Sequence, residues 1–572
     1  MTEQTTYPRH FLKEDFKPKN LDSIQEVYQA LLERDISDQE SLENWCRDWS
    51  ETDSSIAEEG ARRFVQHTCY TDDPEITASY MEWIEKIQPG LKEISFNMDR
   101  KFIDSPALAN LPEEEFGIWT KSVRNSVELF REQNIPLQTE EAKLEAKYDE
   151  TIGAMSVEFD GETRTLPYMG RILEETDRGR REQAFRAIWD RVLQDEDKIQ
   201  GIFDQQLDLR HQMATNAGFD DYRALRFRQL ERFDYGPDEC LQFHDSIESV
   251  ILPLVKERQK KRQEMLGVET LRPWDSAVDP QGRPPLRPQE SGTELIEGCR
   301  QIFAKVHPDL DHMFRILIDG ELLDLNSRAG KAPGGYQCTY HEIRKPFIFM
   351  NAAGKQGDVE TLLHEGGHAF HSIEAREHRF IANRGAPIEF CEVASMAMEL
   401  LGSPYLDVFY NNPDQVVRAR IEHLEGIISL FPWVAMIDSF QHWIYTNPGH
   451  SRDDRKAQWL ATMDRFGTGQ VDWSGLDEIR SHRWMRQSHL FGVPFYYVEY
   501  AIAQLGALQV WRNHREEPNS AIQRYREGLS LGNTRSLPEL YAGAGIRFDF
   551  SKSNLEDLIS MVREEINTLE NS

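Results

Sequence analysis

One short stretch of the sequence carries residues whose types and spacing suit metal chemistry. His364, Glu365 and His368 form the pattern H-E-x-x-H, which on a helix places two imidazoles one turn apart with a carboxylate between them. Apolar residues recur at helical spacing over residues 359–373, and Asp358 before them is a suitable N-cap, so the pattern predicts a helix. Two neutral imidazoles at this spacing can converge on one Zn²⁺, whereas Glu365 would take a proton from a water on the metal.

A zinc site of this kind needs a third protein ligand and leaves a fourth position open for water or substrate. A second helical run is predicted over residues 388–400, and it carries Glu392 and Glu399. Either carboxylate could complete a site of two histidines and one glutamate. On the first helix, His371 follows the two histidines at i+7 and lies on the same side.

The pair Gly366 and Gly367 stands inside the predicted first helix. Two glycines cost a helix interior about 1.5–2 kcal/mol relative to two alanines. We therefore expect that something approaches the helix closely at this point. The alternative interpretation is a surface helix with a chance pair of histidines.

The blocks HEGGHAFHSIEA and FCEVASMAMEL together resemble the zinc oligopeptidases of the oligopeptidase F and thimet oligopeptidase family. In that family the glutamate of the second helix, in an E-x-x-S setting, is the third zinc ligand, and Glu392 matches that position. The resemblance then leaves Glu399, with His371, to support the ligands from outside, Glu399 by orienting a ligand imidazole. Family members often carry a large apolar residue where Gly366 stands, which bears on packing and not on ligation.

Two strands are predicted just before the metal-binding helix, at residues 336–340 and 347–350. Gly334 and Gly335 precede the first strand and let another backbone come near. A strand edge beside a metal can hold a peptide as an added strand, which makes Gly335 and Tyr336 candidate substrate-binding residues. The alternative is a small hairpin that only packs against the helix.

A third informative stretch spans residues 482–500. Tyr497 and Tyr500 are three residues apart, so a helix would present both phenols on one side, and His489 precedes them across a Gly-Val-Pro loop. Taken alone, such an aromatic stripe is more typical of core packing. The family resembled here carries a histidine, a glycine-containing loop and then tyrosines that stabilise the oxyanion. By that resemblance His489 and Tyr500 match best and Tyr497 next, with Tyr496 as the rival for Tyr497.

Composition limits the class of protein and its partners. The 572 residues, 39% hydrophobic and 29% charged, are ordinary for a large soluble protein. A net charge of −32 argues against nucleic acid and anionic membrane as partners. The 6 cysteines show no C-x-x-C pair, and no signal peptide or membrane span is recognisable. We therefore expect a cytoplasmic protein.

The helical periodicity predicts a mainly α fold with a few short strands, including a β-hairpin near residues 153–168 around Asp160-Gly161. We expect an N-terminal helical lobe at 1–200 and a catalytic domain at 201–572, with helices shared between the lobes. The Pro-rich loop 272–290 is not expected to divide domains, because the helices on both sides are alike. A deep central channel between two lobes is implied by the family resemblance alone.

Residues and resemblance together predict a zinc endopeptidase that cleaves internal bonds of short peptides, with one Zn²⁺ per chain. Glu365 would be the general base, and His489 and Tyr500 would stabilise the oxyanion. One alternative is a zinc carboxypeptidase, which would need a cation such as Arg483 or Arg486 for the substrate C-terminus. The other is a peptide-binding protein without catalysis. Cobalt or manganese remain alternatives to zinc, because two-histidine, one-carboxylate sites accept several ions.

Overall fold

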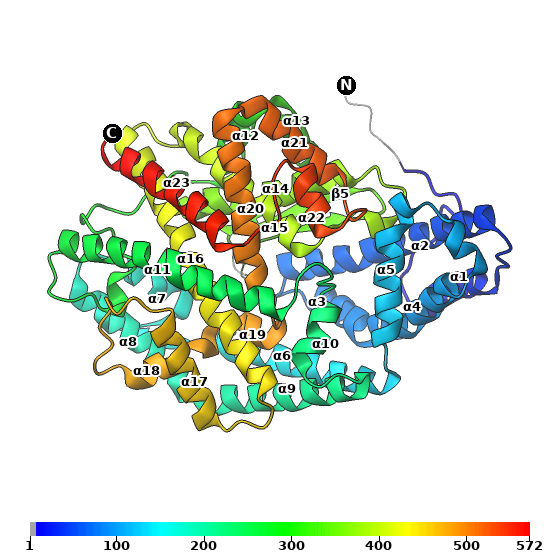
Figure 1. Ribbon diagram of the computed structural model, residues 1–572, viewed down its shortest axis with the longest axis horizontal. Helices are drawn as coiled ribbons and strands as arrows, with labels where there is room; N and C mark the ends of the chain where they lie inside the picture. Colours follow the sequence, from blue (N-terminus) through cyan, green and yellow to red (C-terminus); the bar gives the residue numbers. More distant parts are fainter. Residues whose placement is uncertain (1–6, 329, 333) are drawn as a thin grey trace. The chain divides into compact units, whose positions relative to one another are not determined.

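The computed structural model describes residues 7–328, 330–332 and 334–572. Helices dominate the chain, and the described strands form one two-stranded and one three-stranded sheet (Figure 1). The predicted mainly α class with a few short strands is confirmed. Across the described ranges, no helix is both long and apolar enough to cross a bilayer.

The chain forms two compact units, and each is assembled from three separate segments. Unit 1 consists of Met1–Phe130, Leu286–Arg420 and Ile502–Asp549, and unit 2 of Arg131–Pro285, Ile421–Ala501 and Phe550–Ser572. A unit boundary therefore falls inside the loop 272–290, where we expected none. The helices on both sides of that loop have the same amphipathic character. Only the helices that they pack against show that they belong to different units. The expected division at residue 200 lies within a helix of unit 2.

The helices of unit 1 are α1 (Leu21–Glu33), α2 (Gln39–Cys69), α3 (Pro74–Glu82), α4 (Gln88–Ile103), α5 (Glu113–Leu129), α12 (Gly292–Val306), α13 (Pro308–Asp319), α14 (Gln356–Ala375), α15 (Ile388–Gly402), α21 (Pro518–Ser530) and α22 (Leu537–Gly543). Those of unit 2 are α6 (Ile135–Gly153), α7 (Leu166–Ile172), α8 (Arg178–Gln194), α9 (Glu196–Ala217), α10 (Tyr222–Gln229), α11 (Pro237–Leu266), α17 (Arg452–Arg465), α18 (Asp477–Ser481), α19 (Ser488–Gly492) and α23 (Lys552–Glu570). A unit boundary falls inside each of α16 (Pro413–Thr446) and α20 (Tyr497–Glu516).

The sheet of unit 1 has the order β3-β5-β4, from β3 (Leu323–Asn326), β5 (Lys345–Ala352) and β4 (Tyr336–Tyr340). Strand β4 runs antiparallel to β5, with Tyr336 opposite Phe349, and β3 runs parallel to β5. Both strands predicted before the metal-binding helix are therefore present. Strand β4 is at the edge of the sheet, and no strand of the described residues pairs with its outer side.

The predicted hairpin in unit 2 is also present, from β1 (Ser156–Phe159) and β2 (Glu162–Thr165). Its two turn residues, Asp160 and Gly161, have φ angles of 55° and 79°. Left-handed backbone at both central positions is the turn that Asp-Gly favours between two twisted strands.

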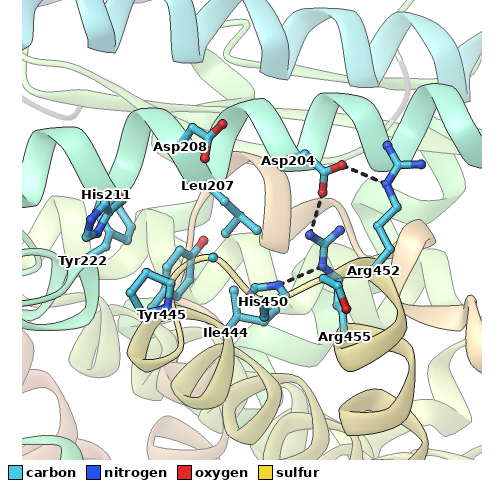
Figure 2. Close-up of a pocket in the computed structure, with 13 residues that line it drawn as sticks. Asp204, Leu207, Asp208, His211, Tyr222, Ile444, Tyr445, His450, Arg452 and Arg455 are labelled. Atoms are coloured by element: carbon cyan, nitrogen blue, oxygen red, sulfur yellow. Dashed lines mark hydrogen bonds and ion pairs between the residues drawn. The ribbon is translucent and has the colours of Figure 1, made fainter.

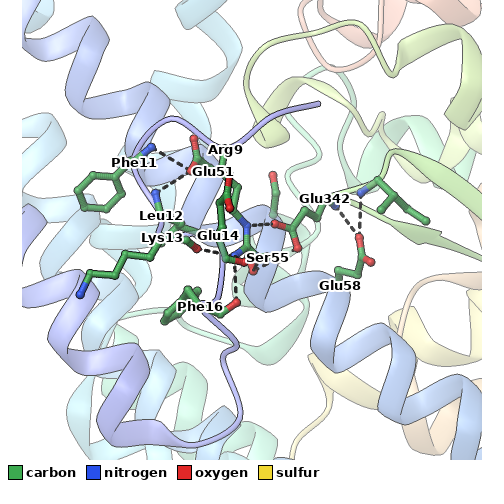
Figure 3. A network of polar contacts seen from close by, with 12 residues as sticks. Arg9, Phe11, Leu12, Lys13, Glu14, Phe16, Glu51, Ser55, Glu58 and Glu342 are labelled. Atoms are coloured by element: carbon green, nitrogen blue, oxygen red, sulfur yellow. Dashed lines mark hydrogen bonds and ion pairs between the residues drawn. The ribbon is translucent and has the colours of Figure 1, made fainter. Parts of the chain in front are cut away.

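The N-terminal segment of unit 1 is tied to helix α2 and to the turn between β4 and β5 (Figure 3). Glu51 of α2 accepts hydrogen bonds from three successive backbone N–H groups, those of residues 10–12. One and two turns further along α2, Ser55 and Glu58 contact the same region, and Glu58 accepts from the backbone of Glu342 and the following residue. Arg9 pairs with Glu342. These contacts connect the N-terminal helices with the hairpin that leads into α14.

Asp53 of α2 gives unit 1 a stability that depends on pH. Its carboxylate accepts a 2.5 Å hydrogen bond from the Tyr28 hydroxyl. Burial raises the pKa of Asp53 to about 7, Asp99 adds to the rise, and Tyr28 opposes it. The unfolded chain releases this proton near pH 3.9. The free energy of unfolding therefore falls as pH rises from about 4 to 7.

Asp53→Asn removes the charge and keeps an acceptor for Tyr28. We expect the melting temperature of the variant, followed by tryptophan fluorescence, to exceed that of the wild type by about 2–4 °C at pH 8 and not at pH 4. An equal gain at both pH values would mean that the ionisation of Asp53 is not the cause.

Unit 2 contains a cavity of about 270 Å³ between α9, α10, the end of α16 and the start of α17 (Figure 2). Several of its polar side chains contact one another: Asp204 accepts from Arg452 and from Arg455, and Arg455 also donates to His450. None of the predicted site residues lines this cavity.

Candidate metal centre

Helix α14 presents the H-E-x-x-H residues and packs on β5 and α15 within unit 1. It begins at Gln356, and its N-cap is Lys355, so the expectation that Asp358 is the N-cap is wrong. Asp358 instead lies inside the first turn, where its Oδ2 accepts from the backbone N–H of Lys355 at 2.9 Å and of Ala353 at 2.7 Å. A carboxylate in the first turn can accept hydrogen bonds from the backbone N–H groups just before the helix, as an N-cap side chain does for those just after it. Helical periodicity does not distinguish an N-cap residue from a first-turn residue.

His364, His368 and Glu392 converge, and their donor atoms all lie within 4.8 Å of one another. Glu392 Oε2 is 3.4 Å from His364 Nε2 and 3.7 Å from His368 Nε2. Ligand atoms at about 2.0–2.1 Å from a tetrahedral zinc ion lie roughly 3.4 Å from one another. The side chains of His364 and His368 remain 23% and 18% exposed, so neither ring is sealed from solvent. These three residues could hold one cation.

Helix α15 supplies the groups that orient two of these three residues. Glu399 Oε1 accepts from His364 Nδ1 at 2.7 Å, which leaves Nε2 of that ring free to face the other ligand atoms. The Ser395 hydroxyl lies 3.0 Å from Glu392 Oε2 and donates toward it. The residues alone left Glu392 and Glu399 as equal candidates for the third ligand. The structure places Glu392 at the convergence point and Glu399 behind His364.

His371 lies outside the ligand group. It is 5% exposed and packs edge-on against Phe390, with ring centroids 5.7 Å apart. Burial lowers the pKa of His371 to about 3. Its Nε2 has no hydrogen-bond partner among the residues that the structure describes. His371 is therefore a neutral residue that packs beside the ligand group.

The electrostatics of the centre follow from burial and from the two glutamates of α15. Burial lowers the pKa of His368 to about 4, which keeps it neutral. Burial acts in the same direction on His364, but its contacts with Glu392 and Glu399 are stronger and raise its pKa well above the ordinary value. Burial raises the pKa of Glu392, and its contacts with both histidines more than reverse this. A cation that binds must therefore displace a proton from His364, so its affinity falls as pH falls.

Glu365 points toward the edge strand of the sheet. It is 6% exposed, and burial raises its pKa to about 7, while a hydrogen bond from the backbone of Gln337 on β4 acts in the opposite direction. Tyr336, the residue before Gln337, stacks on Phe349 with ring centroids 4.9 Å apart, and the Tyr336 hydroxyl forms a hydrogen bond with Thr68. Because the Tyr336 side chain is used in packing, any role of Gly335 and Tyr336 toward a ligand falls to their backbone.

His489, Tyr496, Tyr497 and Tyr500 form one aromatic cluster in unit 2. The His489 ring centroid lies 4.9 Å from that of Tyr497, 5.9 Å from Tyr500 and 6.2 Å from Tyr496. Gln487 Nε2 lies 2.8 Å from His489 Nδ1 and donates to it, which leaves Nε2–H of the ring as a donor. Burial lowers the pKa of His489, so the ring is neutral. Tyr496 and Tyr497 therefore both lie next to His489, and these distances do not choose between them.

Comparison with known proteins identifies the family of this chain. Residues 171–558 match peptidase family M3, and residues 11–130 match the peptidase M3 N-terminal domain. The chain belongs to peptidase family M3. The resemblance to the oligopeptidase F group is thereby confirmed.

Among M3 relatives, the chain is 20% identical over 374 residues to an oligoendopeptidase F homolog of Borreliella burgdorferi, covering 64% of this chain and 61% of the relative. It is 25% identical over 261 residues to oligopeptidase PepF of Bacillus subtilis, covering 44% and 38%. The matched segments thus span less than two thirds of either relative. The structure of PZ peptidase A with an inhibitor superposes with a TM-score of 0.90 at 26% identity, covering 97% of this chain and 99% of that one.

The two glycines of α14 explain how this M3 chain brings its two site helices together. A Cβ at Gly367 would lie 2.4 Å from the carbonyl oxygen of Ala394 and 2.6 Å from Cα of Ser395, and a Cβ at Gly366 would lie 2.6 Å from the ring of Phe303. The expected close approach is confirmed: the α15 backbone lies against Gly367 and an aromatic ring against Gly366. The missing Cβ at Gly367 sets how near Glu392 comes to the histidines.

Gly367→Ala should therefore displace α15 and weaken the centre. We expect a loss of about 1–3 kcal/mol in the free energy of unfolding, as for other overpacked sites, together with weaker metal binding. The matched control is Gly357→Ala in the first turn of α14, where an added Cβ meets nothing within 4 Å. That variant should keep its metal and lose no stability. Equal behaviour of the two variants in thermal melts and metal titrations would contradict the role of Gly367.

Sequence reasoning missed the groups that hold the loop before Tyr496. Phe495 is buried with a φ of 64°, although it is not glycine. Its N–H donates to Gln441 Oε1 at 2.7 Å and its carbonyl accepts from Arg232. Left-handed backbone at a bulky residue costs roughly 1–2 kcal/mol and persists only where its surroundings hold it. No local pattern indicates this strain, because Gln441 and Arg232 are far away in the sequence.

Proposed function

We propose that this M3 peptidase is a zinc-dependent endopeptidase that hydrolyses internal bonds of short peptides. The observation that carries the proposal is the convergence of His364 Nε2, His368 Nε2 and Glu392 Oε2, with Glu365 on the same helix. Two imidazoles and one carboxylate are a donor set of catalytic zinc sites. The names of the relatives, oligoendopeptidase F and oligopeptidase, support short peptides as substrates.

A zinc ion held by these residues would supply a Lewis acid for the scissile carbonyl and lower the pKa of a water molecule to about 7. In the proposed mechanism Glu365 takes a proton from the attacking water and passes it to the leaving amine. A carboxyl group serves both steps best when its pKa lies near the working pH. Burial of Glu365 moves its pKa in that direction, and the backbone of Gln337 holds its side chain.

His489 and Tyr500, with Tyr497 next, are the proposed donors to the developing oxyanion. The neutral Nε2–H of His489, fixed by Gln487, supports this role. Loss of one such donor typically costs ~10²–10³ in turnover. A substrate peptide would add to the free edge of β4 at Gly335 and Tyr336. We further propose a cytoplasmic location, without nucleic acid or membrane partners, in keeping with the net charge of −32.

The test is cleavage of a quenched fluorescent peptide that is blocked at both ends. We expect the protein to cleave it at an internal bond, a chelator to abolish cleavage, and added Zn²⁺ to restore it. A carboxypeptidase would release residues only from peptides with a free C-terminus, and a binding protein would cleave neither. Cleavage of the blocked peptide that persists after complete metal removal would overturn the zinc mechanism.

The carboxypeptidase alternative needs a cation for the substrate C-terminus, and both candidates lie over aromatic rings, Arg486 over Trp189 at 5.8 Å. Arg483, one of its two candidate anchors, lies over the rings of Trp433 and Trp473 at 5.0 and 5.2 Å. This stacking uses the guanidinium for packing within unit 2.

A further inference from the structure

Unit 2 contains a second group of metal-ligand side chains, deep between two helices. Cys240 and His244 are spaced i, i+4 on α11, and Asp438 and His442 are spaced i, i+4 on α16. Exposed fractions are 1% for Cys240, 0% for His244 and Asp438, and 4% for His442. Two i, i+4 pairs on adjacent helices turn four side chains toward one point.

The donor atoms of Cys240, Asp438 and His442 all lie within 4.8 Å of one another. Asp438 Oδ2 is 3.2 Å from His442 Nε2 and 2.8 Å from His244 Nε2. The donor atoms of His364, His368 and Glu392 meet the same 4.8 Å limit, and the Asp438–His442 separation is close to the 3.4 Å between Glu392 and His364. Thiolate, imidazole and carboxylate are the ligand types of zinc and of the metals that replace it.

Two polar atoms of this group lack a partner although water does not reach them. Within the described part of the chain, His244 Nδ1 and Asp438 Oδ1 have no hydrogen bond, and His442 Nε2 has its 3.2 Å contact with Asp438 Oδ2. Buried polar atoms are normally satisfied, so each exception needs a cause. A divalent cation would use His442 Nε2 and the Asp438 carboxylate, and its charge would balance one thiolate and one carboxylate. The buried group would then be electrically neutral.

One contact favours a cluster without metal. Arg223 Nη1 lies 3.3 Å from His442 Nδ1. If Arg223 donates there, His442 carries its proton on Nε2 and faces Asp438 with an N–H. Metal binding through Nε2 moves the proton to Nδ1 and requires Arg223 to turn away. The Arg223 side chain is 25% exposed, so it has solvent to turn into.

We propose that Cys240, Asp438 and His442 bind a second divalent transition metal of the zinc class, with His244 donating a hydrogen bond to the Asp438 carboxylate. This metal is structural, because the site is closed to solvent and the second Asp438 oxygen, Oδ1, which has no partner within the described residues, supplies the fourth ligand atom. It links α11 to α16 next to the strained loop before Tyr496. The His442 ring contacts Phe495 with centroids 5.3 Å apart.

Cobalt substitution tests the proposal without relying on activity. The protein is produced in minimal medium with Co²⁺, so that a buried site fills during folding, and cobalt per chain and the absorption spectrum are measured. Only the second site contains a cysteine, and cobalt bound to a thiolate gives a sulfur-to-metal charge-transfer band in the near ultraviolet. We expect two cobalt ions per chain and this band in the wild type.

Two sets of variants assign the band. The double variant His364→Ala, His368→Ala should keep the band and one cobalt ion, which separates this site from the proposed catalytic one. Cys240→Ser should lose the band. Cys299→Ser is the matched control, since Cys299 is equally buried but lies on α12 of unit 1, and it should keep the band.

A wild-type protein with one cobalt ion and no thiolate band would overturn the second site, whether or not the protein cleaves peptides. So would a band that survives Cys240→Ser. If Cys240→Ser fails to fold, the stoichiometry and band of the wild type and of the double histidine variant decide the question.

Discussion

Replacing Glu365 by glutamine is expected to lower kcat for the blocked peptide by about 10²–10⁴-fold while the metal content stays unchanged. Glutamine keeps the size of the side chain and the acceptor for the Gln337 backbone, but it cannot take a proton from water. Glu365 also lies outside the group of converging donor atoms. The measurement is a progress curve with fluorescent peptide, together with metal analysis of the same sample.

The matched control is Glu374→Gln, which makes the same chemical change on the same helix. Glu374 pairs with Arg526 at 2.6 Å and is not part of the centre, so we expect turnover close to that of the wild type. Full turnover in Glu365→Gln would remove Glu365 from the mechanism. Loss of metal from Glu365→Gln would mean that the carboxylate is a ligand and not the base.

Replacing Glu392 by glutamine should weaken metal binding by more than about 100-fold, with a parallel loss of activity that excess Zn²⁺ partly restores. The neutral amide removes the one negative charge among the three ligand atoms, while Ser395 and the helix remain. Loss of a partner outside the ligands typically costs 10–100-fold, so Glu399→Gln should have the smaller effect of the two. Competition with a chelating dye measures both affinities.

Glu389→Gln is the control for removing a buried charge from α15. Glu389 lies one turn before Glu392, is 4% exposed and is absent from the ligand group. It should keep wild-type metal affinity. If Glu389→Gln loses as much metal as Glu392→Gln, the loss reflects damage to α15 and not ligation.

Much of the site could be predicted because it depends on local pattern. H-E-x-x-H needs only the period of one helix to place His364 and His368 together, and that period is visible in the sequence. The strands before α14 and the Asp160-Gly161 hairpin follow from alternation and from turn residues with left-handed backbone. The glycine pair correctly indicated a close approach, because glycine inside a helix is unfavourable unless the space is needed.

Two local expectations failed for a common reason. Asp358 can satisfy the helix N-terminus from either of two positions, and periodicity does not choose between them. The loop 272–290 separates helices of the same character, and periodicity does not say which helices pack together. In both cases the sequence pattern is compatible with more than one set of contacts.

The sequence by itself determined the mainly α class, the helix that carries His364, Glu365 and His368, and the two carboxylates available as third ligand, because each depends on neighbours a few residues apart. Helical spacing did not choose between them, and the choice of Glu392 came from the family resemblance. The tertiary structure supplies the physical reason, because Glu392 meets the imidazoles and Glu399 lies behind His364 only when α15 approaches Gly367 closely. Only the tertiary structure brings together Cys240 and His442, which no motif connects. Segments far apart in the chain come together through packing, and packing contacts leave no fixed spacing in the sequence.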